Sequence, residues 1–178
     1  CMDHEAGLVM VFYYGERLCP ERMRIIELKT KKQLDLVCGC DQVGSLKLLS
    51  ISNKVALKRL KYDSFGNVLY AAKPQVHIPT GFAGGLMDKD TGLVRFCYRD
   101  YDPTIGRFTC PDPLGDTGGD HDLYDYCVDD PVTMVDYTGL KGEPAPPKYT
   151  SFKDALNDVR GIIRTKPEDV KNLGSALD

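Results

Sequence analysis

The sequence predicts a mainly β fold, an antiparallel β-hairpin repeat segment with a short α-helical C-terminal tail. Short runs of apolar, β-branched and aromatic residues recur up to residue 140, and clusters of Gly, Asp and Asn separate them. Apolar residues at helical spacing occur only beyond that point. These observations favour stacked hairpins and place any helix at the end of the chain.

The strands expected in the first half of the chain follow one another closely. They cover residues 8–14, 24–28, 34–38, 47–51, 55–62 and 68–71. Gly44 marks one of the turns, and the run from Tyr62-Asp63 to Gly66 marks another. In such a hairpin Asp and Gly make the turn, and the Tyr packs on the neighbouring hairpin. These units bury a face only by stacking, so we expect this chain, which begins at Cys1, to be the end of a larger shell.

Two more strands are expected before residue 140, over residues 94–98 and 123–128. The second alternates large and small side chains in the run Leu-Tyr-Asp-Tyr-Cys-Val. Three prolines in residues 141–147 then predict an extended linker, and two short amphipathic helices follow it. We therefore divide the chain into hairpins over 1–79, a core over 80–140 and a C-terminal region over 141–178.

Composition excludes several classes of protein. The net charge of the chain is −3. Residues 86–140 contain twelve aspartates but only four basic residues, and this excess of negative charge discourages direct nucleic-acid binding by this part of the chain. No apolar run is long enough to span a bilayer, and no signal-peptide pattern opens the chain.

The cysteines and aspartates do not form a recognisable metal or cofactor motif. Seven cysteines are an odd number, and we expect most of them to be reduced. Cys38-Gly-Cys40 lacks the spacing of a zinc knuckle, and the run from Asp88 to Gly92 lacks the ligands of a calcium loop. No phosphate-binding loop is present. We therefore predict no metal and no cofactor.

Two phrases with an aspartate three residues before a glycine stand out, Asp112 to Gly115 and Asp136 to Gly139. Aspartate hydrogen-bonds its own backbone in turns, and glycine reaches positive φ at little cost. Each phrase is therefore expected to be a tight turn that presents a carboxylate. Two neighbouring carboxylates can act together as general base and general acid, but the sequence alone does not bring these two turns together.

The sequence around these two motifs resembles the Rhs-repeat-associated core. That core closes the β-strand shell of Rhs/YD-repeat polymorphic toxins and is similar to the C component of Tc toxin complexes. The resemblance covers about residues 41–140. It rests on the runs Gly-Phe-Ala-Gly-Gly-Leu from position 81, Tyr-Arg-Asp-Tyr-Asp-Pro from 98, Gly-Arg-Phe from 106, Asp-Pro-Leu-Gly from 112 and Asp-Leu-Tyr-Asp-Tyr from 122.

This resemblance implies an aspartyl autoprotease that acts once, in cis. Asp112 and Asp136 would be its carboxylates, and the bond between Leu140 and Lys141 would be cut. Arg107, in Gly-Arg-Phe, matches an arginine of the core that could hold a carboxylate or orient the carbonyl, although a structural ion pair explains it equally well. The family has proline after the second aspartate, where this chain has Tyr137. Since proline fixes φ, Tyr137 is expected to loosen the turn and slow cleavage.

The resemblance also implies partners and a location. The partners are the rest of the shell, a C-terminal toxin, an immunity protein and a secretion machinery, and the protein would be made in the bacterial cytoplasm and delivered to target cells. Two alternatives stay open. The hairpins could form a non-catalytic structural or carbohydrate-binding module at a cell surface, or the tail could carry a small activity such as a nuclease.

Overall fold

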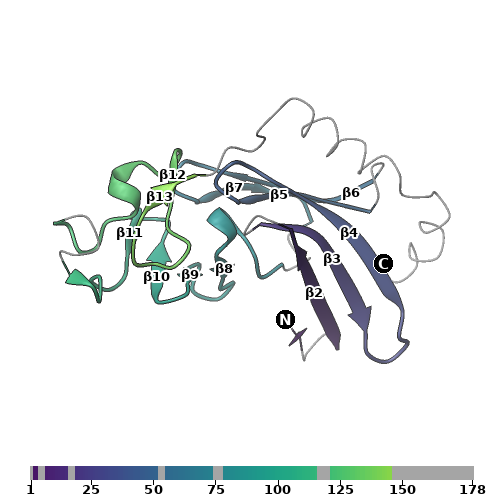
Figure 1. The fold of residues 1–178 in the computed structure, drawn as a ribbon. Helices are drawn as coiled ribbons and strands as arrows, with labels where there is room; N and C mark the ends of the chain where they lie inside the picture. The colour runs from purple at the N-terminus through teal and green to yellow at the C-terminus, as the bar shows by residue number, and fades with distance from the viewer. Residues whose placement is uncertain are drawn as a thin grey trace.

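A computed structural model describes residues 2–3, 7–15, 19–51, 55–73, 78–115 and 121–145. Throughout these residues the paired strands are antiparallel, and helical structure is confined to short 3-10 turns, so the prediction of a mainly antiparallel β fold is confirmed. The helices predicted after residue 150 lie outside the described residues. Figure 1 shows a long curved sheet beside a smaller, more irregular body.

The long sheet is a meander in which each strand pairs with the next along the chain. Apolar side chains of these strands gather on one face of the sheet, where Leu and Met residues form a buried cluster that also includes Ile78. Its strands in order are β1 Met2–Asp3, β2 Leu8–Tyr14, β3 Pro20–Glu27, β4 Gln33–Cys40, β5 Leu46–Ile51, β6 Val55–Tyr62 and β7 Val68–Ala71.

The smaller body contains a four-stranded sheet and a two-stranded one. The first has the order β11-β10-β9-β8, and the second pairs β12 with β13. The bounds are β8 Leu86–Met87, β9 Val94–Phe96, β10 Arg99–Asp102, β11 Arg107–Phe108, β12 Met134–Val135 and β13 Glu143–Pro144, with 3-10 turns at Phe82–Gly84 and Cys127–Asp129.

The prediction of a strand over residues 123–128 is wrong. Asp122 caps a turn there, because its carboxylate accepts the N–H of Tyr124 and its carbonyl accepts the N–H of Asp125. After Tyr126, the three consecutive residues Cys127, Val128 and Asp129 have φ of 61°, 54° and 57°. Residues with these φ values cannot belong to an extended strand, so the alternation of large and small side chains in this run does not lead to strand pairing.

The smaller body is built around a cluster of stacked rings. Tyr101, Phe108 and Tyr126 pack edge to face or tilted against one another, with ring centroids 4.6–5.9 Å apart. Phe82 and Phe96 complete the cluster. These rings come from the turns and short strands of 82–126, so the aromatic cluster compensates for the scarcity of regular hydrogen-bonded structure in this part of the chain.

The turn at Tyr62-Asp63 joins the two bodies. Asp63 Oδ1 accepts the N–H groups of Phe65 and Asn67, at 3.0 and 2.9 Å, which closes the turn. Asn67 Nδ2 then donates to Pro103 O at 2.8 Å, and Tyr101 Oη donates to Phe65 O at 2.8 Å. The turn thereby fixes the end of β10 and the residue that follows it against the β6–β7 connection of the long sheet.

One pair of cysteines departs from the expectation of reduced thiols. Cys19 and Cys40 form a disulfide that links the start of β3 to the end of β4, with their Cα atoms 6.6 Å apart. The other cysteines of the described part are free, namely Cys38, Cys97, Cys110 and Cys127. No helix among the described residues is long and apolar enough to cross a membrane.

Candidate active site

Asp112 follows β11 and closes a short turn with its own side chain. Its Oδ1 accepts the N–H of Leu114 at 2.7 Å, and its carbonyl accepts the N–H of Gly115 at 3.0 Å. Gly115 has a φ of +58°, the left-handed conformation that glycine adopts most easily. The N–H of Asp112 donates to Leu123 O at 2.8 Å, so the turn is fixed to the segment that follows it in the chain.

Asp136 follows β12 and closes the second turn more extensively. Its Oδ1 accepts the N–H groups of Gly139 and Leu140, at 2.8 and 3.1 Å, and the hydroxyl of Thr138 at 3.2 Å. The residue is only 1% exposed. A carboxylate this deeply buried needs polar partners on every side, and these three donors satisfy one of its two oxygens.

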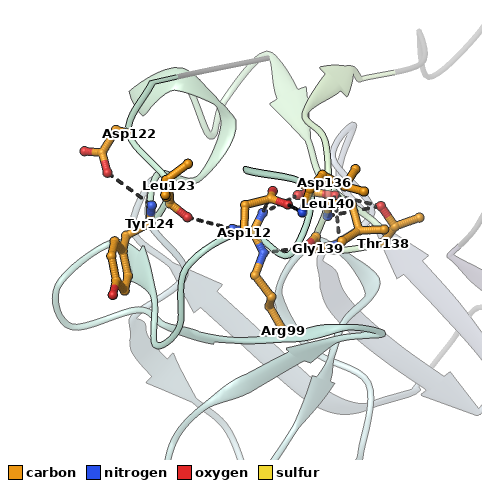
Figure 2. A network of polar contacts seen from close by, with 10 residues as sticks. Arg99, Asp112, Asp122, Leu123, Tyr124, Asp136, Thr138, Gly139 and Leu140 are labelled. Carbon is orange, nitrogen blue, oxygen red and sulfur yellow. Dashed lines mark hydrogen bonds and ion pairs between the residues drawn. The ribbon is translucent and has the colours of Figure 1, made fainter. Parts of the chain in front are cut away.

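Arg99 brings the two carboxylates together. Its Nη2 lies 2.8 Å from Asp112 Oδ2 and 3.5 Å from Asp136 Oδ2, although the two aspartates are distant in the sequence. Both oxygens contact one nitrogen, so they cannot be further apart than the sum of these distances. Figure 2 shows the guanidinium between the two turns. A single positive charge therefore faces two carboxylates, and all three side chains are nearly buried, which strengthens the interaction between them.

The rest of the Arg99 guanidinium is also engaged. Nη1 donates to Leu123 O at 3.0 Å, and Nε donates to Gly139 O. The ring of Phe108 covers one face, with its centroid 3.7 Å from Arg99 Cζ. Arg99 is 4% exposed, which makes it one of the few buried charged side chains in the described part of the chain. It connects both Asp turns to the aromatic cluster.

Arg107, the arginine expected at the site, lies elsewhere. It pairs with Asp122, and the two side chains are 42% and 44% exposed. A hydrogen bond from the N–H of Tyr124, followed by the contact with Arg107, lowers the pKa of the Asp122 carboxyl. Neither contact brings Arg107 to Asp112 or Asp136, so the geometry is that of a surface ion pair on the smaller body.

A cavity of about 160 Å³ opens beside the paired carboxylates, which is room for a few water molecules. Both residues of the Leu140–Lys141 bond line it. The other walls include Arg99, Asp112, Leu123, Asp125, Cys127, Met134, Asp136 and Gly142. The two carboxylates and the peptide bond that the family resemblance implies as the cut site therefore adjoin one cavity.

The chain is held on both sides of that bond. Upstream, Thr138 O accepts the N–H of Tyr98 at 3.1 Å. Downstream, β13 pairs with β12, and the N–H of Ala145 donates to Thr133 O at 2.8 Å. The bond thus lies in a stretch that is tied to the fold at either end, as a bound peptide substrate would be.

Two groups near Asp136 stay protonated well above neutral pH. Burial raises the pKa of the Cys127 thiol to about 12, and burial also raises the pKa of the Tyr126 hydroxyl. The Tyr126 hydroxyl is buried, and no group within the described residues has the geometry of a full hydrogen bond to it. The Asp136 main chain and the Cys127 thiol are nevertheless close enough to affect its pKa. Both groups are therefore neutral neighbours of the paired aspartates. No group of three His, Cys, Asp or Glu side chains is arranged for a metal ion in the part of the chain that the structure describes.

Sequence reasoning missed Arg99, although a signal for it exists. Along β10 the side chains of Arg99 and Tyr101 are buried, and those of Asp100 and Asp102, which alternate with them, are half-buried. An arginine at an inward position of a strand requires buried acidic partners, because an unpaired buried charge is costly. That argument identifies Arg99 only when it is known that residues 99–102 form a strand and that position 99 points inward.

Comparison with known proteins gives a consistent result. A model of the teneurin YD-shell family matches residues 2–132. Teneurin-3 of Danio rerio is 32% identical over 102 residues, which is 54% of this chain and 4% of that protein. Protein YlbH of Escherichia coli (strain K12) is 38% identical over 64% of this chain and 48% of its own length. RhsB of Dickeya dadantii (strain 3937), described as a probable deoxyribonuclease, is 36% identical over 54% of this chain and 7% of its own.

Solved structures show the same fold. The crystal structure of TcdB2-TccC3 has a TM-score of 0.64 at 25% identity, covering 75% of this chain and 7% of that one. The TcdB2-TccC3-TEV structure has a TM-score of 0.66 at 24% identity, covering 75% of this chain and 6% of that one. The chain thus spans less than half the length of each of these relatives.

Proposed function

Because the chain belongs to the teneurin YD-shell family, we propose that it is the closing core of an Rhs-type toxin shell that cuts its own chain after Leu140. The observation that carries the proposal is the contact of Arg99 Nη2 with both Asp112 and Asp136 beside the Leu140–Lys141 bond. The similarity to RhsB and to TcdB2-TccC3 supports the toxin context.

The proposed reaction is a hydrolysis by paired carboxylates. One aspartate accepts a proton from a water in the cavity, and the water oxygen adds to the carbonyl carbon of Leu140. The other aspartate enters the reaction protonated and gives its proton to the nitrogen of Lys141 as the C–N bond breaks, which leaves a new carboxyl group on Leu140 and a new amine on Lys141. The Arg99 guanidinium stabilises the negative charge that develops at the site. The catalyst and the bond belong to one chain, so each molecule reacts once.

The proposal extends to partners and location. The remaining shell of the same polypeptide would enclose a toxin that begins after Leu140, and an immunity protein and a secretion machinery would act with it. The protein would be made in the bacterial cytoplasm and delivered to target cells. The names and folds of the relatives support this setting, while the residues that follow position 145 lie outside the described part.

Intact-mass measurement of the incubated full chain tests the proposal. Wild-type protein is expected to yield the pieces 1–140 and 141–178, at a rate independent of protein concentration. Asp112→Asn and Asp136→Asn should each leave the chain whole with its circular dichroism unchanged. Asp125→Asn is the matched control, because Asp125 lines the same cavity and is not one of the two proposed catalytic carboxylates, and it should still allow the cut.

Two results would count against self-cleavage. Cutting that persists in both Asn variants removes the aspartates from the mechanism. A wild-type chain that stays whole, alone and within a full shell, favours a second candidate, a non-catalytic shell segment. The hydrogen bonds of Asp112 and Asp136 to their own turns support that candidate, since both carboxylates also serve to close the backbone. An activity of the tail, such as a nuclease, is tested separately with the 141–178 peptide.

A further inference from the structure

The Gly-Arg-Phe run at residues 106–108 contributes to the site through its phenylalanine. In the β10–β11 register Tyr101 lies opposite Phe108, and Arg99 precedes Tyr101 by two residues. Residues two apart on a strand share a face, so Phe108 and Arg99 are diagonal neighbours on the inner face of the sheet. This register places the Phe108 ring centroid 3.7 Å from Arg99 Cζ.

The ring and the acceptors around Arg99 restrict different motions. Around the edge of the guanidinium, Gly139 O and Leu123 O accept its N–H groups, and the two carboxylates form ion pairs with Nη2. The Phe108 ring lies over its face, where no hydrogen bond forms. A ring there prevents the planar group from tilting, excludes water from the face and attracts the positive charge.

The contacts of Arg99 with Gly139 and with Phe108 also differ in whether they depend on the segment to be cut. Gly139 O belongs to the segment that carries the Leu140–Lys141 bond, and its position depends on the turn of Asp136. Phe108 belongs to β11, and its own N–H donates to Tyr124 O at 2.9 Å. Its ring is fixed by Tyr101 and Tyr126 in the aromatic cluster. The ring is therefore a support for Arg99 that does not depend on the segment to be cut.

We propose that Phe108 is a positioning residue that holds the Arg99 guanidinium in the one orientation in which Nη2 reaches both Asp112 and Asp136. The effect on cleavage rests on the function proposed above, whereas the effect on Arg99 does not. Replacing the ring by a smaller aliphatic side chain frees the face of the guanidinium, and both its protection from water and its alignment then decline.

The test compares Phe108→Leu with Phe82→Leu in the full chain. Phe82 is a matched control because it is equally buried, at 2% exposure, and lies in the same cluster, while its ring neighbours are Tyr62, Tyr101 and Tyr126. The first readout is solvent exchange of the Arg99 Nε proton by NMR. It is measured in an Asp112→Asn background, so that all variants share one uncut covalent state.

We expect Phe108→Leu to speed that exchange by at least about tenfold and Phe82→Leu to leave it within about threefold of the parent. Phe108→Tyr keeps an aromatic face and should stay near the parent. The second readout is the first-order cleavage rate without the Asn change, which should fall at least about tenfold in Phe108→Leu and change little in Phe82→Leu.

The two readouts separate the two proposals. Unchanged Arg99 exchange in a folded Phe108→Leu protein overturns the role of Phe108, whatever the cleavage rate. Equal acceleration by Phe108→Leu and Phe82→Leu also overturns it, because that result describes general loosening of the cluster. A wild-type chain that is never cut contradicts self-cleavage, and the exchange measurement then still decides whether Phe108 positions Arg99.

Discussion

Asp136 Oδ1 accepts the N–H of Leu140 at 3.1 Å, which joins a candidate catalytic carboxylate to the residue that supplies the carbonyl of the bond to be cut. The same oxygen also accepts the N–H of Gly139. The peptide unit just before the bond is therefore fixed by the carboxylate itself. Holding the reacting groups in one geometry removes much of the entropic barrier to reaction, so changes at this turn are expected to alter cleavage and stability together.

Arg99→Lys should abolish most cleavage, and Arg107→Lys should not. A lysine has no planar fork to reach Asp112, Asp136 and two carbonyls at once, so we expect the cleavage rate to fall at least about 100-fold. Arg107 forms an exposed ion pair, and its replacement should change the rate by less than about threefold.

The arginine comparison uses intact mass over time, on proteins shown to be folded by circular dichroism. A larger loss in Arg107→Lys than in Arg99→Lys would restore the assignment made from the sequence. Equal losses would mean that neither arginine has a specific place in the reaction.

Gly139→Ala should destabilise the protein more than Gly92→Ala. Both glycines have positive φ, +72° and +75°, so the backbone strain of an added side chain is similar, about 1 kcal/mol. At Gly139 the new Cβ would lie 2.5 Å from Phe96 O, whereas at Gly92 it meets nothing within 4 Å. We expect Gly139→Ala to lower the free energy of unfolding by about 3 kcal/mol or more. Urea titrations of both variants measure the difference, and similar losses would argue against the close docking of this turn.

Tyr137→Pro should speed cleavage while it lowers stability. Proline presets φ in the turn, so the reactive geometry forms more often. The Tyr137 side chain, however, is partly buried against the aromatic cluster, and its loss should reduce the free energy of unfolding by about 1–2 kcal/mol. Tyr137→Ala removes the same ring without fixing φ and should lose stability with no gain in rate. Equal rates in the two variants would show that the turn is not the slow element.

Alkaline pH should destabilise the fold through two thiols. Burial raises the pKa of Cys38 and of Cys127 to about 12, from an ordinary value of 9.0. Between these values the unfolded chain releases protons that the folded chain keeps, so stability is intact below pH 9 and falls as the pH rises toward 12. Each thiol contributes up to about 1.4 kcal/mol per pH unit in that window.

The thiol effect is measured as the free energy of unfolding against pH, from pH 8 to 11. The double variant Cys38→Ala, Cys127→Ala should show a shallower decline than wild type. The same change at Cys97 and Cys110, whose side chains are exposed, is the control and should keep the wild-type slope. A slope that depends on the exposed pair would contradict this account.

Local sequence patterns predicted most of the long sheet, although not β1 or the start of β3, and they predicted less of the smaller body. The apolar and β-branched runs gave the bounds of β2, β6 and β7 directly, because each strand lies in a simple meander with its neighbours in sequence. The run 123–128 has the same alternation, but the Asx turn at Asp122 and the left-handed residues after Tyr126 replace a strand there. Nothing local distinguishes the two cases.

The choice between the two arginines depended on geometry that the sequence does not contain. Arg99 and Arg107 lie on adjacent strands, yet Arg99 shares the inward face with Phe108 and Arg107 pairs with Asp122 outside. Which of the two arginines faces the core depends on which side chains of each strand point inward and on the β10–β11 register. Asp112 and Asp136 were identifiable because each closes its own turn locally, whereas their meeting at Arg99 is a long-range contact.

The pairing of β13 with β12 affects the energetics of the cut. If the Leu140–Lys141 bond is hydrolysed, Gly139 O still accepts from Arg99, and Ala145 still donates to Thr133 O. The new carboxylate and the new amine then remain neighbours at a high effective concentration, so the bond can also re-form. Cut and joined chains would reach an equilibrium inside the shell. Separation of β13 from β12, rather than the chemistry at the carboxylates, would then make the cut irreversible.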